Sequence, residues 1–331
     1  MLSPVILAQK PEGLSRNLPS RLRIFSGSAN PGLAQEVAQY LHCELGLMVR
    51  KRFADGEIYV QFQESIRGCD VYLMQPTCQP VNDHLLELLI MIDACRRASA
   101  RQITAVIPYY GYSRADRKTA GRESITAKLT ANLITQAGAH RILAMDLHSA
   151  QTQGYFDIPV DHIFAAPVLH RYLRTKEIDD VVIVSPDIGG VARARAFAKH
   201  LNDAPLAIID KRRPDHNCAD IMNVIGEVNG KTAVIIDDII DTASTITECA
   251  RALKEAGAST IYACATHAIF SPPAINRISN GFFEKIIVTN TIPVPQEEVQ
   301  QLKILSVAEL ISEAIRRIHK EYSVSSMLQS P

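Results

Sequence analysis

Apolar runs rich in β-branched residues alternate along the chain with segments whose apolar positions recur at helical spacing. Short apolar runs are typical of buried strands, and amphipathic segments are typical of the helices that pack on them. The strands predicted in the first half are 21–26, 58–62, 70–75, 103–109 and 141–147. The helices predicted between them are 32–46, 82–98 and 124–137.

The second half repeats this order of elements. Its predicted strands are 180–185, 206–209, 233–236, 260–265 and 285–290. We therefore predict an α/β fold with two tandem domains of one topology, each a mainly parallel sheet flanked by helices. Alternating strands and helices are common, so coincidence is the alternative explanation. The predicted organisation is a loose tail at 1–20, domains at 21–165 and 166–320, and a second tail at 321–331.

The segment around residues 233–257 carries the most specific polar pattern. Asp237 and Asp238 end a buried apolar run, and the hydroxyl-rich loop 241–245 precedes a helix that Gly257 ends. Free N–H groups at a helix N-terminus attract a phosphate. Paired carboxylates could hold the hydroxyls of a sugar, directly or through Mg²⁺. The pattern predicts a site for a phosphorylated sugar, although Asp, Ser and Thr also favour purely structural caps and turns.

The corresponding stretch of the first half, 75–80, differs in its chemistry. It contains no carboxylate, and Pro76 and Pro80 have no N–H group to offer an anion. We therefore predict that the first domain does not bind a sugar phosphate at this position.

Other polar residues follow predicted strands, where the ligands of α/β folds bind. Lys211 and Arg213 follow the strand 206–209 and could clamp a polyphosphate, or belong to a solvated basic loop. His148 and Asp187 also follow strands and could share Mg²⁺ with nucleotide phosphates, although each could be structural. The turn 53–57 could stack a base on its Phe, or be a plain acidic turn.

Composition excludes several classes of function. The 331 residues carry 35 Lys and Arg against 35 Asp and Glu, so a general nucleic-acid binder is not expected. The seven cysteines form no C-x-x-C pair and indicate reduced thiols of a cytoplasmic protein. No apolar run reaches the ~20 residues that span a bilayer, so no membrane association is expected.

Several motifs, in one order, resemble the ribose-phosphate pyrophosphokinase family, in its bacterial phosphate-activated class. These motifs are SGSANP, RFADGE, PYYGYSRADRK, GRESITAKL, MDLHSAQTQGYFDIP, VSPDIGG, DKRRP and VIIDDIIDTAST. The last is similar to the phosphoribosyl-binding motif of the type I phosphoribosyltransferase fold. The resemblance implies two tandem domains of that fold, a homohexamer, and a cytoplasmic enzyme of nucleotide biosynthesis.

The reaction that this resemblance implies transfers the β,γ-diphosphoryl group of ATP to the 1-hydroxyl of ribose 5-phosphate, giving phosphoribosyl pyrophosphate and AMP. The implied ATP contacts are Phe53, Asp55, Gly56, Glu57 and Arg114. The implied Mg²⁺ ligands are His148 and Asp187, and the implied catalytic residues are Lys211 and Arg213. Ribose 5-phosphate is assigned to Asp237, Asp238, Asp241, Thr242, Ala243, Ser244 and Thr245. A regulatory site for phosphate and ADP is assigned to Ser65, Arg67, Arg122, Ser323 and Ser325.

Two other functions fit parts of this pattern. A phosphoribosyltransferase that consumes phosphoribosyl pyrophosphate would share the loop 237–245, but it would need neither the turn 53–57 nor the DKRRP segment. A regulatory homologue without turnover would be indicated by loss of the acidic pair or of Lys211, and this chain has both. The feature in its favour is Ser244, where the family usually has Gly.

Overall fold

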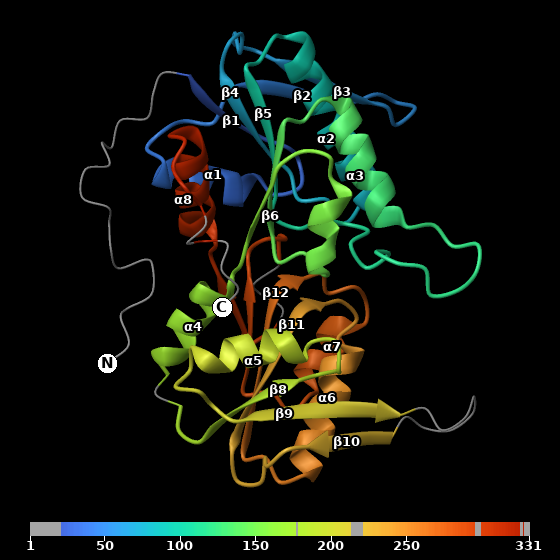
Figure 1. Ribbon diagram of the computed structural model, residues 1–331, viewed down its shortest axis with the longest axis vertical. Helices are drawn as coiled ribbons and strands as arrows, with labels where there is room; N and C mark the ends of the chain where they lie inside the picture. Colours follow the sequence, from blue (N-terminus) through green and yellow to red (C-terminus); the bar gives the residue numbers. More distant parts are fainter. Residues whose placement is uncertain (1–20, 177, 213–220, 295–298, 325–326, 328–331) are drawn as a thin grey trace. The chain divides into compact units, whose positions relative to one another are not determined.

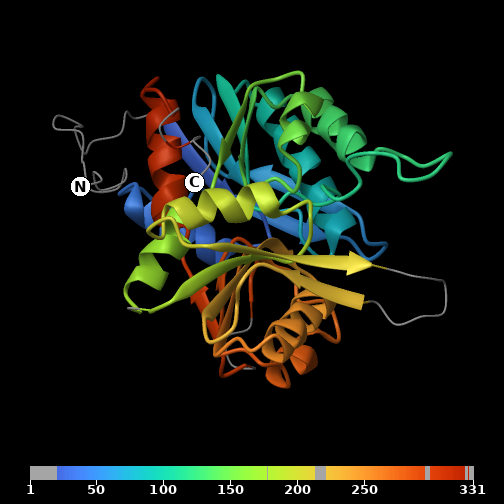
Figure 2. The same cartoon turned by 60° about the horizontal axis from the view of Figure 1, so that its bottom comes forward.

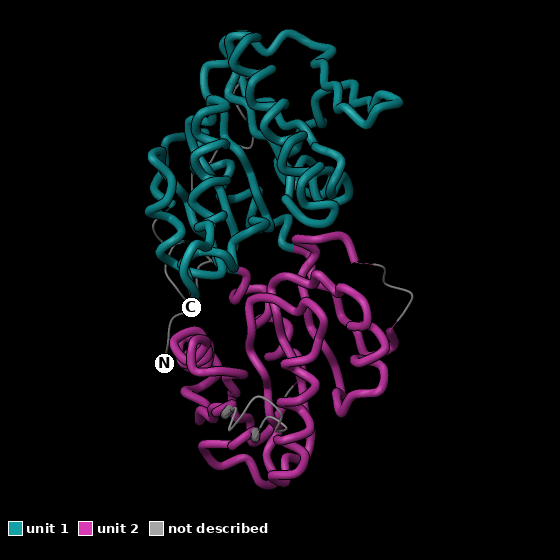
Figure 3. Tube along the Cα trace, turned by 90° about the vertical axis from the view of Figure 1, so that its right-hand side faces the viewer, with its two compact units in different colours: residues 1–164, 307–329 teal, residues 165–306, 330–331 magenta. Residues whose placement is uncertain are grey.

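The structure, a computed structural model, describes residues 21–176, 178–212, 221–294, 299–324 and 327. The chain divides into two compact units (Figure 3). Unit 1 comprises residues 1–164 and 307–329, and unit 2 comprises residues 165–306 and 330–331. The tail predicted at 1–20 lies outside the described residues.

Unit 1 is built on a parallel sheet of order β1-β4-β5-β6-β7. Its strands are β1 (Leu22–Ser26), β4 (Asp70–Met74), β5 (Gln102–Ile107), β6 (Arg141–Met145) and β7 (Val160–Ile163). Its helices are α1 (Pro31–Tyr40), α2 (Val81–Arg97), α3 (Thr126–Ala137), the short η1 (Ala150–Tyr155) and α8 (Ala308–His319). Figure 1 shows α2 and α3 on one face of this sheet and α1 and α8 on the other.

The apolar periodicity explains these layers. Alternate strand residues such as Val71, Leu73 and Ile103 pack with Leu88 of α2 and Ile134 of α3 in one core. The helix α3 ends where predicted, because Gly138 takes a left-handed φ of 117°. The helix α1 ends at Tyr40, earlier than the predicted 46.

A hairpin stands apart from the sheet of unit 1. Its strands β2 (Met48–Arg52) and β3 (Ile58–Phe62) pair only with each other among the described strands, in antiparallel register from Met48↔Phe62 to Arg52↔Ile58. The turn between them, 53–57, contains Gly56 at a φ of 97°, which glycine adopts readily. The hairpin therefore presents the predicted ATP-binding turn at its tip.

Unit 2 contains a larger sheet of order β10-β9-β8-β11-β12-β13-β14. Its strands are β8 (Val181–Ser185), β9 (Leu206–Arg212), β10 (Ile221–Ile225), β11 (Thr232–Ile240), β12 (Thr260–Ala268), β13 (Lys285–Thr289) and β14 (Leu302–Leu305). Apart from the antiparallel pair β9–β10, neighbouring strands are parallel. The order β8-β11-β12-β13-β14 matches that of unit 1, which confirms the predicted fold class.

Helices cover both faces of this sheet (Figure 2). They are α4 (Ala166–Arg174), α5 (Val191–Lys199), α6 (Ser244–Glu255) and α7 (Ala274–Ser279). Ile235 of β11 packs in the core that includes α6 and α7, whereas its neighbours Val234 and Ile236 pack with α4 and α5. This alternation explains why residues 233–236 of β11 are all apolar. None of the helices in the described part of the chain has the length and apolar content needed to cross a membrane.

Two strands of unit 2 extend beyond their predicted ends. Asp237 and Asp238 do not end β11, because its pairing with β12 continues to Ile240↔Ala268 while its pairing with β8 stops at Ile235↔Val184. Lys211 lies inside β9 rather than after it, paired with Met222 of β10. In both cases a neighbouring strand, β12 for β11 and β10 for β9, pairs with residues beyond the apolar run.

The predicted domain 166–320 needs a correction at its C-terminal end. The helix α8 belongs to unit 1 rather than to the unit that precedes it in sequence. It contacts α1, and Arg316 donates a hydrogen bond to the carbonyl of Tyr40 at 3.2 Å. The apolar face of α8 thus completes the helical layer over β1 in unit 1, which chain order alone did not indicate.

Candidate functional site

The acidic pair of β11 shares one cationic partner in unit 2. Arg193, on α5, places its Nη1 atom 3.1 Å from Oδ1 of Asp237 and 3.1 Å from Oδ1 of Asp238. The side chain of Asp238 is 4% exposed and that of Asp237 is 20% exposed, so a charged cluster is largely removed from water. Burial and the charge of Asp238 raise the pKa of Asp237 to about 8, although Arg193 opposes the shift.

The hydroxyl-rich loop joins β11 to α6, and its backbone is held in place. Ala243 adopts the left-handed conformation, with φ of 59°, and Ser244 begins the helix. Arg277 of α7 donates from Nη1 to the carbonyl of Thr242 at 2.9 Å. The first N–H groups of a helix have no partner within the helix, so this loop offers donors suited to a phosphate.

Lys211 reaches the same helix from β9. Its Nζ lies 3.2 Å from Oε2 of Glu248, and Oε1 of Glu248 accepts a hydrogen bond of 3.1 Å from the Ser244 hydroxyl. Neither Glu248 nor Arg193 was predicted from the sequence. The spacing of four residues between Ser244 and Glu248, one helical turn, was the available signal for Glu248.

The loop that carries Asp187 packs against α6. Oδ1 of Asp187 accepts a hydrogen bond of 2.7 Å from the backbone N–H of Gly190, and the carbonyl of Pro186 lies 3.7 Å from Sγ of Cys249. Burial and the negative charges of Asp237, Glu248 and Asp187 raise the pKa of Cys249, and Lys211 opposes them. Unit 2 therefore brings these charged groups together around the first turns of α6.

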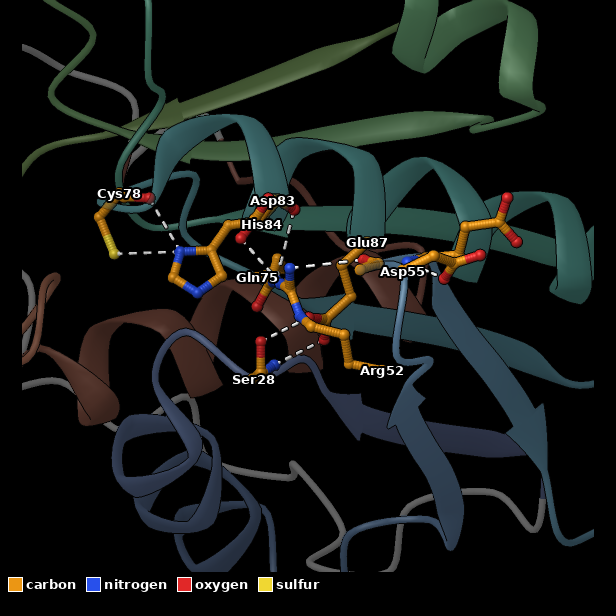
Figure 4. Close-up of polar contacts among 10 residues, drawn as sticks. Ser28, Arg52, Asp55, Gln75, Cys78, Asp83, His84 and Glu87 are labelled. Carbon is orange, nitrogen blue, oxygen red and sulfur yellow. Dashed lines mark hydrogen bonds and ion pairs between the residues drawn. The ribbon is translucent and has the colours of Figure 1, made fainter.

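In unit 1, the turn 53–57 is anchored to α2 (Figure 4). Arg52, next to the turn, donates from Nη2 to Oδ2 of Asp83 at 2.7 Å. Arg50, two residues earlier on β2, lies 3.8 Å from Oε1 of Glu87, one helical turn after Asp83. The two ion pairs form a ladder, because four residues along a helix and two along a strand cover similar distances.

The turn itself presents an exposed aromatic ring beside two acids. Phe53 is 52% exposed and meets Tyr59 edge to face, with ring centroids 6.0 Å apart. Asp55 accepts a hydrogen bond of 3.1 Å from the backbone N–H of Glu57, which fixes the turn. Arg114 is exposed in the loop after β5. Tyr112, in the same loop, is hydrogen-bonded to Asn82 at the start of α2.

The loop after β1 in unit 1 has its donors occupied by the chain's own side chains. The backbone N–H of Ser28 donates to Oε1 of Glu87 at 2.7 Å, and that of Ala29 donates to Oε1 of Gln75 at 3.1 Å. Figure 4 shows Ser28 and Glu87 facing each other beside Gln75. Gln75 and Glu87 are 0% and 5% exposed. These contacts occupy two N–H groups of the loop after β1, whereas the expectation concerned 75–80 after β4, so the absence of a sugar-phosphate site there stays a prediction.

The remaining predicted residues are spread over both units. His148 is exposed after β6, and His162 of β7 accepts a hydrogen bond of 2.9 Å from the neighbouring N–H of Leu147. His148 belongs to unit 1 and Asp187 to unit 2, so their sharing of a metal stays a prediction. Within the described residues, no group of three or more His, Cys, Asp or Glu side chains is arranged to hold a metal ion.

The residues predicted to form a regulatory site are partly described. Ser65 and Arg67 are exposed, and Arg67 donates to the Ser99 hydroxyl at 3.2 Å. The carbonyl of Ser323 accepts from Arg317 at 3.2 Å. Arg122 lies in the loop before α3, with φ of 68°. Ser325 and Arg213 lie outside the described residues, and the assignment stays a prediction.

Family models and known proteins match most of the chain. A family model for the N-terminal domain of ribose phosphate pyrophosphokinase matches residues 22–138, and one for the phosphoribosyl synthetase-associated domain matches residues 207–329. The ribose-phosphate pyrophosphokinase of Synechococcus elongatus is 74% identical over 93% of this chain and 94% of that protein. Ribose-phosphate pyrophosphokinase 1 of Spinacia oleracea is 65% identical over 96% of this chain and 95% of that protein.

Among solved structures, the chain is similar to phosphoribosylpyrophosphate synthetase from Mycobacterium smegmatis. The two are 43% identical in sequence, with a TM-score of 0.87, and the match covers 91% of this chain and 99% of that one. Sequence and fold therefore agree over both units.

Proposed function

The chain belongs to the ribose-phosphate pyrophosphokinase family, and from this premise we propose that it transfers the β,γ-diphosphoryl group of ATP to the 1-hydroxyl of ribose 5-phosphate. The products are phosphoribosyl pyrophosphate and AMP. The observation that carries the proposal is the placement of Asp237 and Asp238, held by Arg193, immediately before the phosphate loop 241–245.

In unit 2 the two ends of ribose 5-phosphate have chemically matched partners. The N-terminus of α6 and the hydroxyls of Thr242, Ser244 and Thr245 bind the 5-phosphate. The carboxylates of Asp237 and Asp238 accept hydrogen bonds from the vicinal ribose hydroxyls. A sugar bound at both ends is fixed in orientation, which lowers the entropy cost of bringing its 1-hydroxyl into line for attack.

The nucleotide is assigned to unit 1. The exposed ring of Phe53 stacks on the base, while Asp55, Gly56 and Glu57 line the ribose and Arg114 neutralises phosphate charge. Diphosphoryl transfer requires little covalent chemistry from the protein, so positioning and charge neutralisation account for most of the catalysis. Lys211 and Arg213 supply positive charge to the transferred group.

Asp187 of unit 2 has the chemistry of a Mg²⁺ ligand. This ion prefers oxygen ligands, keeps several waters, and is usually bound through one or two carboxylates together with substrate phosphates. Asp187 fits that role, because its Oδ1 is held by Gly190 and the residue is exposed. His148 is the second proposed ligand. When bound, the ion neutralises charge on the nucleotide phosphates.

Assembly, regulation and location are part of the same proposal. We expect a cytoplasmic homohexamer that inorganic phosphate activates and ADP inhibits. The regulatory site is assigned to Ser65, Arg67, Arg122, Ser323 and Ser325. Neither nucleic acid nor membrane is an expected partner, since the formal net charge is zero and the described helices do not span a bilayer.

AMP formation from ATP, measured with and without ribose 5-phosphate and Mg²⁺, tests the proposed function. Product should require all three components. The double variant Asp237→Asn, Asp238→Asn should lower the rate by about 10²-fold or more, because it removes the carboxyl groups that orient the reacting sugar. Asp179→Asn, an exposed acid of the same unit, is the control. AMP release that is independent of ribose 5-phosphate would reject the function.

A further inference from the structure

One carboxylate connects the phosphate loop with the proposed catalytic lysine. Glu248 accepts the hydroxyl hydrogen bond of Ser244 through Oε1, at 3.1 Å, and contacts Nζ of Lys211 through Oε2, at 3.2 Å. The side chains of Lys211 and Glu248 are 32% and 29% exposed, so the pair is partly shielded from solvent. Partial burial strengthens a charge–charge contact relative to a fully exposed pair.

Both donors that Glu248 engages are groups that the proposed function assigns to phosphates. The Ser244 hydroxyl stands at the first position of α6, where a 5-phosphate would bind, and Lys211 is assigned to the transferred diphosphoryl group. A carboxylate is an anion with two acceptor oxygens, so it can satisfy these donors in place of a phosphate oxygen. Glu248 therefore occupies, from within the chain, donors that the substrates need.

The negative charge of Glu248 opposes the binding of a phosphate at the start of α6. The Glu248 carboxylate lies within hydrogen-bonding distance of Ser244, the first residue of α6, so its negative charge is next to the place assigned to the 5-phosphate. A phosphate at the N-terminus of α6 would lie about one helical turn from Glu248, and like charges that close repel each other. Binding of the phosphate thus favours breaking the contacts of Glu248 with Ser244 and Lys211.

We propose that Glu248 is an internal competitor for the sugar phosphate: it holds the Ser244 hydroxyl and Lys211 until ribose 5-phosphate displaces it. The inference rests on the proposed function, because it assumes that the loop 241–245 binds the 5-phosphate. Displacement releases Lys211 at the moment when the acceptor sugar is in place. Sugar-phosphate binding and availability of the lysine are then coupled through one side chain.

The variant Glu248→Gln separates the charge of this residue from its shape. The amide keeps the size of the side chain and an oxygen that accepts from Ser244, but it neither repels a phosphate nor pairs electrostatically with Lys211. Calorimetric titration of the full-length protein with ribose 5-phosphate and Mg²⁺ should give about three- to tenfold tighter binding than wild type. Glu255→Gln, an exposed acid at the end of the same helix, should leave the dissociation constant unchanged.

Steady-state kinetics distinguish this role of Glu248 from a purely structural one, because a structural role would not lower KM for ribose 5-phosphate. Glu248→Gln should lower KM for ribose 5-phosphate without lowering kcat. In the background Lys211→Gln, the gain from Glu248→Gln should shrink, because part of it comes from freeing the lysine. Unchanged or weaker binding in a Glu248→Gln protein of normal melting temperature would overturn the proposal. If the wild-type protein does not bind ribose 5-phosphate at all, both the proposed function and the role of Glu248 are rejected.

Discussion

Ser244 begins α6 with helical backbone, and the left-handed conformation of this loop falls on Ala243. The glycine that the family usually has at position 244 is therefore not required here for positive φ. Serine is acceptable at the start of a helix, and its N–H is one of the first-turn donors that we propose for the phosphate. The strained residue is Ala243, because a side chain in the left-handed region costs roughly 1–2 kcal/mol.

Ser244→Gly should therefore change KM for ribose 5-phosphate by less than about tenfold, or ~1.4 kcal/mol. The matched variant Ala243→Gly relieves strain of roughly 1–2 kcal/mol, but it also frees the unfolded chain by about 0.4–1 kcal/mol and removes a buried methyl worth about 0.8 kcal/mol, so the free energy of unfolding should change by less than about 1 kcal/mol. Steady-state kinetics and denaturant unfolding measure the two effects. Activity that appears only after Ser244→Gly would instead identify the chain as a regulatory homologue with a blocked phosphate loop.

Asp237 makes stability depend on pH. Its pKa is raised to about 8 in the folded protein from an ordinary value near 3.8, so the folded state binds a proton that the unfolded state has lost between these pH values. Stability should therefore fall as pH rises through this window. Asp237→Asn removes the effect, so without Mg²⁺ its melting temperature should exceed that of wild type by about 2–4 °C or more at pH 8.

The same comparison at pH 4 is the control, because wild-type Asp237 is then protonated and resembles the amide. The difference in melting temperature between Asp237→Asn and wild type should shrink toward zero there. A difference that stays constant from pH 4 to pH 8 would mean that the charge of Asp237 is not what destabilises wild type.

At the scale of elements, sequence periodicity predicted the cores of the strands and helices but not where two strands end. The apolar runs at 206–209 and 233–236 lie in β9 and β11, but Asp238 and Ile240 beyond the second run are buried as well. The C-terminal ends of β9 and β11 stay in the sheet because β10 and β12 pair with them there. The apolar pattern of a strand does not contain the register of its partner, so it did not indicate how far the pairing extends.

The candidate site was predictable to a similar extent. The acidic pair and the loop 241–245 are contiguous in sequence, and local chemistry identified them. Arg193 lies on α5, 44 residues before Asp237 in the sequence. Only the packing of α5 beside β11 brings the two side chains together. Arg277 reaches the loop from α7 in the same way. A tertiary contact of this kind has no signal in a single sequence.

The ladder between β2 and α2 predicts a defined effect on the nucleotide turn. Asp83→Asn removes the partner of Arg52, and this ion pair is exposed, with side chains 40% and 52% accessible. Exposed pairs contribute at most about 1 kcal/mol, so the protein should keep its fold. The turn 53–57 loses an anchor, and KM for ATP should rise by about two- to fivefold.

The control for Asp83→Asn is Asp93→Asn on the same helix. Asp93 forms an ion pair with Arg97 at 2.7 Å, and this pair is also exposed. Both residues lie on α2, so the pair includes no residue of the hairpin. Its loss should leave KM for ATP unchanged. Exchanging the charges, with Arg52→Asp and Asp83→Arg together, should restore KM toward wild type. Equal effects of Asp83→Asn and Asp93→Asn would remove the anchoring role.

At the scale of the whole molecule, one topology occurs twice and the two copies differ in chemistry. The strand orders β1-β4-β5-β6-β7 and β8-β11-β12-β13-β14 correspond, and the repeat was visible in the sequence. In unit 1, Glu87 and Gln75 occupy the N–H groups of the loop after β1. In unit 2, the acidic pair lies on β11, which corresponds to β4 of unit 1, and the start of α6 follows it, where we propose the sugar-phosphate site. The assignment of α8 to unit 1 was not visible, because it depends on packing against α1.

Calorimetric titration of the full-length protein with ribose 5-phosphate tests the central claim most directly, since it counts sugar-phosphate sites per chain. We predict one site, with binding lost in the double variant Asp237→Asn, Asp238→Asn and retained in Asp179→Asn. The reason is that unit 2 alone combines paired carboxylates with a phosphate loop among the described residues. Two equivalent sites per chain, or retained binding in the double variant, would contradict this account.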